Sequence, residues 1–298
     1  MKKCEKALVL AESYSVSPET YFDDEMRGEI AETSLSAATA IDIAMWDLRA
    51  KMDGLSLAVV MGGSLKDLQT DFTIGIMDAE EAGLEATRLT NEGFRSIKVK
   101  IGKSLSEDLD RVRAVRNSSG PSAKIYVDAN GGYDPESAAR FWEKASEYGL
   151  EFFEQPVPAD MLKEMASLRE RGVRVCADES FTDEASLNKM IQLEAVDLVN
   201  IKLMKCGGLS PAMRLARTAK HAGVETMVGC MGDVGISVAA AAHLACCIEP
   251  RQVDLDSHLN IEQICNGPDV VRGSVVLPDM PGIGVGLKEG WQKWKTEC

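Results

Sequence analysis

Charged residues end a series of short apolar segments at a regular spacing along this chain. Lys100, Asp128, Glu154, Asp178 and Lys202 each follow a segment rich in β-branched or aromatic residues, and successive members lie 24 to 28 residues apart. A period of that length accommodates one strand and one crossover helix. Parallel strands joined in this way bring their carboxyl ends to the same rim of a barrel, where the charged side chains would meet. The spacing therefore predicts a barrel of alternating strands and helices.

The period places eight strands in the larger, C-terminal part of the chain. We expect them near residues 75, 99, 127, 153, 176, 200, 227 and 254, with the first strand over residues 71–76. Residues 70–298 come close to the roughly 250 residues typical of such a barrel. The predicted fold class is therefore α/β, with residues 70–298 as a TIM-like (β/α)7β barrel that forms the catalytic domain.

Residues 1–69 carry a helical pattern instead. Apolar side chains recur at helical spacing from residue 32 to residue 52, and Gly54 is a suitable stop. Residues 14–20 are expected to form a loop that leads into a short helix. We therefore predict a mostly helical N-terminal domain over residues 1–69, to which the C-terminal tail of the barrel domain could return.

Two barrel helices carry their own boundary signals. Asp134 and Ser210 are residues that favour the N-cap, and each is followed by a proline that suits the first helical position. Gly149 and Gly223 are placed to end the same two helices. This agreement between turn chemistry and strand period supports the eight-stranded barrel.

Composition excludes several classes of partner. The formal net charge of -14 and the sequence pI near 4.8 argue against a nucleic acid or an anionic membrane surface. The sequence has neither an apolar run long enough to span a bilayer nor a secretory signal at its start. Its eight cysteines form no C-x-x-C pair, which indicates reduced thiols. We expect a cytoplasmic protein.

Residues 96–102 read as a buried strand that carries Lys98 and Lys100. Side chains two apart on a strand point to the same face, so both ammonium groups enter one space. Burying two cations together is unfavourable unless anions meet them there. An edge strand with two solvated lysines is the alternative that this segment alone leaves open.

Three carboxylates, Asp128, Glu154 and Asp178, follow on adjacent strand ends. Carboxylates placed so close together repel one another unless a cation neutralises them. A ligand set of oxygens without histidine or cysteine suits a hard ion such as Mg²⁺. The alternative is that each carboxylate caps the helix that follows it. Three such residues in regular series favour the metal site.

Lys100 and Lys202 end the second and sixth of the eight strands, so they are expected on opposite sides of the barrel mouth with the metal between them. A lysine beside another cation, partly removed from water, loses proton affinity and can act as a base. Two opposed bases beside a metal-bound carboxylate can remove an α-proton and return a proton to the other face.

Five motifs carry a resemblance to a known family. They are Lys98-Val99-Lys100, Val127-Asp128-Ala129-Asn130, Phe153-Glu154-Gln155-Pro156, Ala177-Asp178-Glu179-Ser180 and Asn200-Ile201-Lys202-Leu203-Met204-Lys205. From about residue 31 to residue 286 the chain resembles the enolase superfamily, in particular its muconate-lactonising subgroup, whose sites use lysine bases and Mg²⁺. The resemblance implies that Lys100 and Lys202 are the acid/base pair and that Lys98 assists the substrate carboxylate. It also implies Asn130 and Glu179 as outer partners of the site.

The pair Asp254 and Asp256 is similar to the Asp-x-Asp motif of dipeptide epimerases, which holds the free α-ammonium group of the substrate. Adjacent anions at a barrel rim require a cation, which agrees with that role. A salt bridge to a surface lysine or arginine is the alternative. The resemblance further implies that Cys230 and Gly232, in the turn after the seventh strand, meet the peptide. Thr73 on the first strand matches a substrate-facing threonine.

In the same family an α+β cap covers the barrel and closes over the substrate side chain. Residues 1–69 resemble only its helices, so we expect an incomplete N-terminal α+β cap, a remnant of the capping domain. The helix expected over residues 32–52 would then lack neighbours and leave apolar surface that favours a homo-oligomer.

The function that the resemblance implies is an isomerase, a Mg²⁺-dependent dipeptide epimerase. It would carry out 1,1-proton transfer at the α-carbon of the C-terminal residue of a dipeptide of the Ala-Glu type, through a metal-stabilised enediolate. One alternative is another cycloisomerase, dehydratase or N-acylamino-acid racemase with the same metal and lysines. Another is a catalytically weak or inactive truncated barrel.

Overall fold

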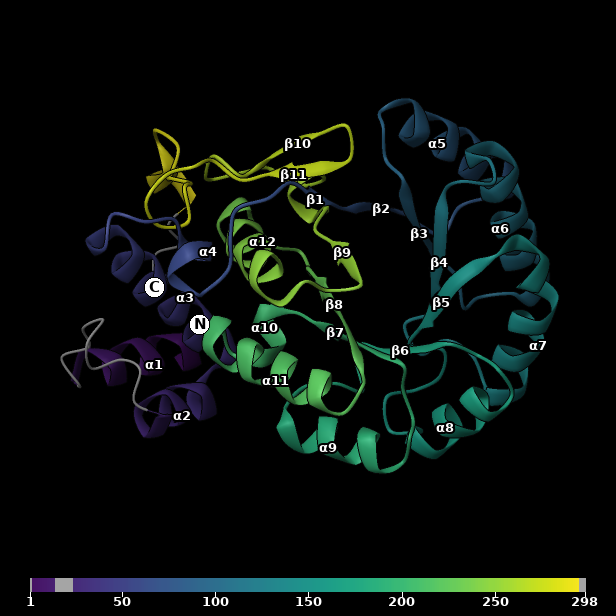
Figure 1. Ribbon diagram of the computed structural model, residues 1–298, viewed down its shortest axis with the longest axis horizontal. Coiled ribbons are helices and arrows are strands. Elements are labelled where there is room, and N and C mark those ends of the chain that lie inside the picture. The colour runs from purple at the N-terminus through teal and green to yellow at the C-terminus, as the bar shows by residue number, and fades with distance from the viewer. Residues whose placement is uncertain (1, 14–23, 295–298) are drawn as a thin grey trace.

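Eight parallel strands curl into a barrel at the centre of the structure, each paired with the next along the chain (Figure 1). This computed structural model describes residues 2–13 and 24–294. The barrel strands are β2 (Asp71–Ile74), β3 (Ser96–Lys100), β4 (Lys124–Asp128), β5 (Leu150–Glu154), β6 (Val175–Ala177), β7 (Leu198–Ile201), β8 (Glu225–Gly229) and β9 (Gln252–Asp254). The predicted eight-stranded α/β barrel is confirmed, although its first strand ends at residue 74, not 76.

The first and last strands are joined by hydrogen bonds that involve side chains. The backbone N–H of Leu255 donates to the hydroxyl of Thr70 at 2.9 Å. The backbone N–H of Thr73 donates to a carboxylate oxygen of Asp256 at 2.8 Å. These contacts hold β2 against the end of β9 and bring Asp256 to the same rim as the strand ends.

Helices surround the barrel and connect its strands (Figure 1). They are α5 (Ala79–Asn91), α6 (Leu105–Ser119), α7 (Pro135–Ala145), α8 (Leu162–Glu170), α9 (Glu184–Gln192), α10 (Leu203–Cys206), α11 (Leu209–His221) and α12 (Gly235–Ile248), with 3-10 turns at Ser146–Tyr148 and Ser257–Leu259. Asp134 caps α7 as predicted, because its carboxylate accepts the backbone N–H of Ser137 at 2.9 Å. Gly149 follows in the left-handed conformation, with φ of 61°.

The predicted N-cap at Ser210 is wrong. Helix α11 begins at Leu209, two residues before the predicted start at Pro211, and its N-cap is Gly208 with a positive φ of 123°. A side chain there would overlap Asp42, whose carboxylate accepts the backbone N–H of Ser210 at 3.0 Å. An aspartate from a distant helix thus satisfies the orphan donor that a cap residue would otherwise satisfy.

One layer of side chains fills the barrel directly below its C-terminal rim. It consists of one residue from each of β4 to β8: Tyr126, Phe152, Cys176, Leu198 and Met227. In β4 and β5 the next inward position along the strand carries a carboxylate, because inward-facing positions alternate along a strand. The rings of Tyr126 and Phe152 stack at a centroid distance of 4.4 Å. This apolar layer is the floor of the site.

Within the described residues before the barrel, the helices are α1 (Lys2–Ser13), α2 (Asp24–Thr33), α3 (Leu35–Met52) and α4 (Leu57–Val60). Figure 1 shows them together on the side of the barrel formed by α10, α11 and α12. The helix expected from residue 32 begins at Leu35, because Ser34 caps it by accepting the backbone N–H of Ala37 at 3.3 Å. The loop expected over residues 14–20 lies outside the described residues.

Helix α3 has neighbours, contrary to the expectation that it would lack them. Its Thr39 donates a hydrogen bond to the backbone oxygen of Leu203 at 3.0 Å, and its Trp46 donates to the hydroxyl of Ser210 at 2.8 Å. Both contacts reach the segment that follows β7. The N-terminal helices are therefore attached to the barrel next to one side of the predicted site.

A small antiparallel sheet joins the segment that precedes the barrel to the segment that follows it. It contains β1 (Leu68–Gln69), β11 (Ser274–Val276) and β10 (Asp269–Val271), in that order, and a last 3-10 turn covers Trp291–Trp294. Beyond the sheet, the backbone of Gly282 exchanges hydrogen bonds with Leu55 and Leu57 at 2.9 and 2.8 Å. The C-terminal segment thus contacts the N-terminal region, while the domain boundary at residue 70 stays a prediction.

Within the described part of the chain, no helix has the length and apolarity required to cross a bilayer. Seven cysteines of that part have free thiols, and most of them are buried.

Candidate active site

Lys98 is buried at the centre of the predicted site, with a side chain only 3% exposed. Its ammonium nitrogen lies 3.0 Å from Asp128, 2.9 Å from Glu154 and 3.0 Å from Asp254. The ring of Tyr126, in the floor layer, lies 5.8 Å below the same nitrogen. Lys98 therefore joins the carboxylates of β4 and β5 to the first aspartate of the Asp-x-Asp pair.

Lys100 lies two residues further along β3, nearer the rim, and its side chain is 27% exposed. It donates to Asp128 at 2.6 Å and to the side-chain oxygen of Asn130 at 2.7 Å. Asn130 has a left-handed φ of 45°, and its amide nitrogen donates to Glu179 at 2.9 Å. The two residues expected as outer partners thus fix the orientation of the group that contacts Lys100.

Glu154 is fully buried and accepts the side-chain amide of Asn200 at 2.8 Å through one carboxylate oxygen. Its other oxygen accepts no hydrogen bond and lies 2.9 Å from the ammonium nitrogen of Lys98. Sequence reasoning missed the role of Asn200, although it precedes Lys202 by two positions on the same strand. A buried carboxylate oxygen without a donor is a position at which a cation would be favourable.

Asp178 follows β6 and is contacted by two lysines. Lys202 donates to one carboxylate oxygen at 2.7 Å, and Lys205 donates to the other at 2.5 Å. Lys205 was present in a quoted motif, but the sequence assigned it no role. The predicted metal ligands thus fall into two sets. Asp128 and Glu154 contact Lys98, whereas Asp178 contacts Lys202 and Lys205.

The pKa values of these groups follow from burial and from their charged neighbours. Burial raises the pKa of Glu154 to about 7, and Asp128 contributes in the same direction. For Asp178, burial also opposes ionisation, but Lys205 and Lys202 outweigh it and hold its pKa below the ordinary value. For Lys202, burial favours the neutral amine, but Asp178 and Glu154 outweigh it and raise the pKa. Lys202 is therefore an ammonium group unless further positive charge offsets the carboxylates.

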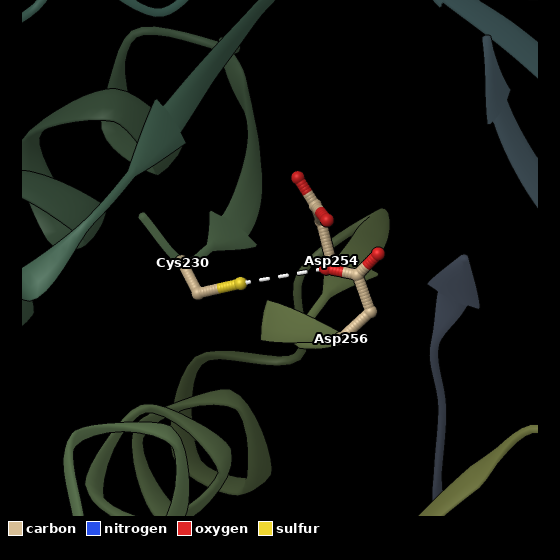
Figure 2. A group of neighbouring side chains, drawn as sticks. All are labelled: Cys230, Asp254 and Asp256. Atoms are coloured by element: carbon tan, nitrogen blue, oxygen red, sulfur yellow. Dashed lines mark hydrogen bonds between the residues drawn. The ribbon is translucent and has the colours of Figure 1, made fainter. Parts of the chain in front are cut away.

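Cys230, Asp254 and Asp256 form a second group at the rim, and Figure 2 shows the thiol of Cys230 pointing toward the carboxylate of Asp256, with Asp254 beside them. All three are buried, and one ligand atom of each lies within 4.8 Å of the others. The thiol of Cys230 lies 3.7 Å from a carboxylate oxygen of Asp256. Burial and the neighbouring carboxylate of Asp254 raise the pKa of Asp256, because both disfavour its ionised form.

The remaining predicted residues lie near this second group. Thr73 contacts Asp256 through its backbone N–H, at 2.8 Å, so the structure places it beside the aspartate pair. Gly232 is exposed in the loop after β8, and a Cβ atom added at this position would meet no other atom within 4 Å. The amide of Met231 in that loop donates to Asp233 at 2.7 Å.

Beneath the aspartate pair lies a buried polar group that the sequence did not reveal. Asp71, fully buried on β2, accepts hydrogen bonds from the hydroxyl of Tyr126 and from Gln252, the latter at 2.9 Å. Burial and the nearby Asp254 and Asp256 raise its pKa well above the ordinary value. The sequence feature that could have indicated this buried group is the aspartate at the first position of the strand.

A comparison with protein families matches residues 81–291 to the family described as "Enolase C-terminal domain-like". The chain belongs to this family. Among curated proteins it is 35% identical over 260 residues to the L-Ala-D/L-Glu epimerase of Clostridium acetobutylicum, covering 84% of this chain and 72% of that protein. It is 37% identical over 262 residues to the L-Lys-D/L-Arg epimerase of Methylococcus capsulatus, covering 84% and 72%.

Among solved structures of the enolase-like family, the dipeptide epimerase of Cytophaga hutchinsonii, complexed with Mg and the dipeptide D-Ala-L-Val, matches with a TM-score of 0.86. The identity is 28%, and the match covers 91% of this chain and 76% of that one. The predicted resemblance to the enolase superfamily and to its dipeptide epimerases is confirmed.

The residues present fit a magnesium ion. Asp128, Glu154 and Asp178 offer carboxylate oxygens at adjacent strand ends, and one buried oxygen of Glu154 has no donor. The group formed by Cys230, Asp254 and Asp256 suits Mg²⁺ less well, because a thiol is a soft ligand and Mg²⁺ prefers oxygen. A substrate ammonium group suits that second group better, because it donates hydrogen bonds and needs only negatively charged acceptors.

Proposed function

We propose that this chain is a Mg²⁺-dependent dipeptide epimerase that inverts the α-carbon of the C-terminal residue of a dipeptide of the Ala-Glu type. One observation carries the proposal: two separate anionic groups flank a single buried lysine. Lys98 lies 2.9 Å from Glu154 on one side and 3.0 Å from Asp254 on the other. A dipeptide has an ammonium group that the Asp254 side can hold directly, and a carboxylate that can bind on the Glu154 side through Lys98 and a Mg²⁺ ion held there.

The aspartate pair orients the substrate. Asp254 and Asp256 are 3% and 5% exposed, and their buried charge favours an ammonium group over a neutral amide. An ammonium group held there fixes the amino end of the dipeptide. Lys98, between the pair and the carboxylates of β4 and β5, is placed to contact the substrate carboxylate.

Lys100 and Lys202 then move the proton. They reach the site from β3 and from the end of β7, two well-separated strands of the barrel. One lysine, as a neutral amine, takes the α-proton from one face, and the other, as an ammonium group, donates a proton to the opposite face. Mg²⁺, when bound by Asp128, Glu154 and Asp178, would supply positive charge that stabilises the substrate carboxylate as the α-proton leaves and that offsets the anions around Lys202.

The relatives support this proposal and also show that side-chain preference varies. One relative is named for Ala-Glu substrates and another for Lys-Arg substrates, at 35% and 37% identity. The site described above recognises the backbone ends of a dipeptide and leaves its side chains unspecified. The Ala-Glu preference is therefore the part of the proposal most in need of a direct test.

The test is to incubate the protein with Mg²⁺ and separate dipeptides, and to follow inversion by ¹H NMR. We expect L-Ala-L-Glu to be converted to L-Ala-D-Glu, and L-Lys-L-Arg and N-acetyl-L-Glu to react more slowly. Faster turnover of N-acetyl-L-Glu would favour an N-acylamino-acid racemase. No inversion of any of these compounds would favour a weak or inactive barrel.

A further inference from the structure

Asp178 is held by two ammonium groups that come from one turn of the chain. Lys202 donates to one of its carboxylate oxygens at 2.7 Å, and Lys205 donates to the other at 2.5 Å. Lys202 is the N-cap residue of α10 and Lys205 lies in its single turn, which places both side chains on the same side of the short helix. The two lysines compete for the same carboxylate but differ in their other contacts.

Lys205 is attached to Asp178 in more ways than Lys202 is. Its nitrogen also donates to the backbone oxygen of Asp178 at 2.6 Å, and it lies 5.6 Å from the ring centre of Phe181. Phe181 is fully buried, and its own N–H donates to the same backbone oxygen at 3.1 Å. Lys205 therefore contacts the backbone and the side chain of Asp178 together, which fixes the direction of the carboxylate.

The backbone that carries Lys205 is held in place by a helix outside the barrel. Helix α10 begins with Leu203, whose backbone oxygen accepts the hydroxyl of Thr39 on α3 at 3.0 Å. The N–H of Lys205 donates to the backbone oxygen of Lys202 at 3.0 Å. The turn that carries both lysines is thus held by an N-terminal helix. Because the backbone of Lys205 is fixed, its ammonium group can hold Asp178 in a fixed orientation.

The two lysines must behave differently if Lys202 is a base. To accept a proton from a substrate, Lys202 has to release Asp178 and present a neutral amine to the α-carbon. Asp178 would then lose one of its two side-chain partners. Lys205, with its additional contact to the backbone of Asp178, can remain.

We propose that Lys205 is a positioning residue that holds the carboxylate of Asp178 in the direction needed for metal binding. This inference rests on the proposed function, because it assumes that Asp178 is a metal ligand and Lys202 a base. Partners that orient metal ligands commonly change metal affinity or activity by about 10- to 100-fold when they are removed.

The two possible roles of Lys205, as a counter-charge or as a residue that orients Asp178, predict opposite changes in Mg²⁺ affinity when Lys205 is removed. If Lys205 were only a counter-charge, its removal would take a positive charge away from the metal site, and Mg²⁺ would bind more tightly. If Lys205 orients Asp178, its removal leaves the carboxylate free to turn, and Mg²⁺ binds more weakly. Affinity for the metal alone therefore separates the two roles without any measurement of activity.

The experiment compares K205M and K205Q with the unaltered protein, and K189M serves as the control because Lys189 is exposed on α9. Mg²⁺ binding is measured by calorimetry without substrate, and thermal unfolding shows which variants are folded. We expect Mg²⁺ affinity about 10- to 100-fold weaker in the folded Lys205 variants and unchanged in K189M. Unchanged or tighter Mg²⁺ binding would overturn the proposal.

A second measurement uses exchange of the α-proton of L-Ala-L-Glu and of L-Ala-D-Glu in D₂O at saturating Mg²⁺. A disoriented Asp178 should slow exchange from both substrates by the same factor, since both reactions use the same metal site. A loss confined to one of them would mean that Lys205 acts on Lys202, and would also overturn the proposal. If the unaltered protein exchanges neither, the proposed function fails, and the Mg²⁺ titration still decides the role of Lys205.

Discussion

The carboxylates of the site differ in their partners: some contact a lysine, and others accept hydrogen bonds from uncharged donors. Asp256 accepts the backbone N–H of Thr73 at 2.8 Å and lies beside Asp254, so its charge is available to a substrate cation. Lys98, in contrast, already neutralises part of Asp254. Asp256 is therefore the residue at which the ammonium site can be tested with least effect on the rest.

We predict that D256N lowers kcat/KM for L-Ala-L-Glu by about 10- to 100-fold, since a hydrogen bond to a charged group is worth about 1.5–3 kcal/mol. Asparagine keeps an oxygen for the N–H of Thr73 while it removes the charge. D110N, at an exposed position on α6, is the control and should leave kcat/KM unchanged. An equal loss for N-acetyl-L-Glu would show that Asp256 does not recognise the ammonium group.

Removal of metal is the second test at this scale. If Asp128, Glu154 and Asp178 form the oxygen ligand set, EDTA should abolish turnover, and excess Mg²⁺ should restore it. D128A should abolish turnover as well and lower the thermal unfolding midpoint, because the buried ammonium group of Lys98 loses one of its carboxylate partners. Full turnover in excess EDTA would contradict the metal site.

The sequence predicted candidate residues whose placement follows from the strand period, and missed candidates whose contacts form between strands. Lys100, Asp128 and Lys202 could be predicted because each ends a strand at a regular interval. Asn200 could not, because its partner Glu154 lies two strands away in the sheet. Lys205 contacts Asp178 from the short helix α10, and no spacing rule indicates such a contact.

At the scale of helices and strands, the sequence predicted the strands well and some helix starts poorly. Strand positions follow from an apolar period that is local in the chain. The start of α11 follows from Asp42, a residue of α3 that takes over the role of an N-cap from a distance. Local turn chemistry cannot reveal a cap that is supplied by tertiary structure.

His243 connects three separate elements and makes their packing sensitive to pH. From α12, its Nδ1 accepts the backbone N–H of Ala58 at 3.1 Å, and its other nitrogen lies 3.2 Å from the backbone oxygen of Ile283. It is fully buried, and burial lowers its pKa to about 4. The neutral form is therefore the one that the folded protein favours.

A lowered pKa in the folded state fixes the sign of the pH effect. The unfolded chain binds a proton near pH 6.5 and the folded chain only near pH 4, so His243 stabilises the fold above pH 6.5 and loses that contribution as pH falls toward 4. We predict that H243Q reduces the loss of unfolding free energy between pH 7.5 and pH 4.5 by roughly 2–3 kcal/mol. Urea denaturation at both pH values measures it.

The control for that measurement is H221Q, at the exposed end of α11, which should keep the pH dependence of the unaltered protein. If H243Q and H221Q behaved alike, the pH dependence would arise from other groups, and His243 would have no special part in it.

For the whole molecule, net charge and apolar surface act against each other. The charge of -14 opposes self-association, most strongly at low salt. On α3, however, Leu48 and Met52 are 42% and 61% exposed. We predict a homo-oligomer in light scattering at physiological salt, and a shift toward monomer in M52E. A monomer at all salt concentrations would contradict this prediction.

The two-lysine arrangement is the central claim, and exchange of the α-proton in D₂O tests it most directly. K100A and K202A should each fail to invert L-Ala-L-Glu, because inversion needs both faces. Each variant should still exchange the α-proton of one isomer, L-Ala-L-Glu or L-Ala-D-Glu, and the two variants should retain opposite isomers. Exchange of both isomers at equal rates in either variant would contradict the account.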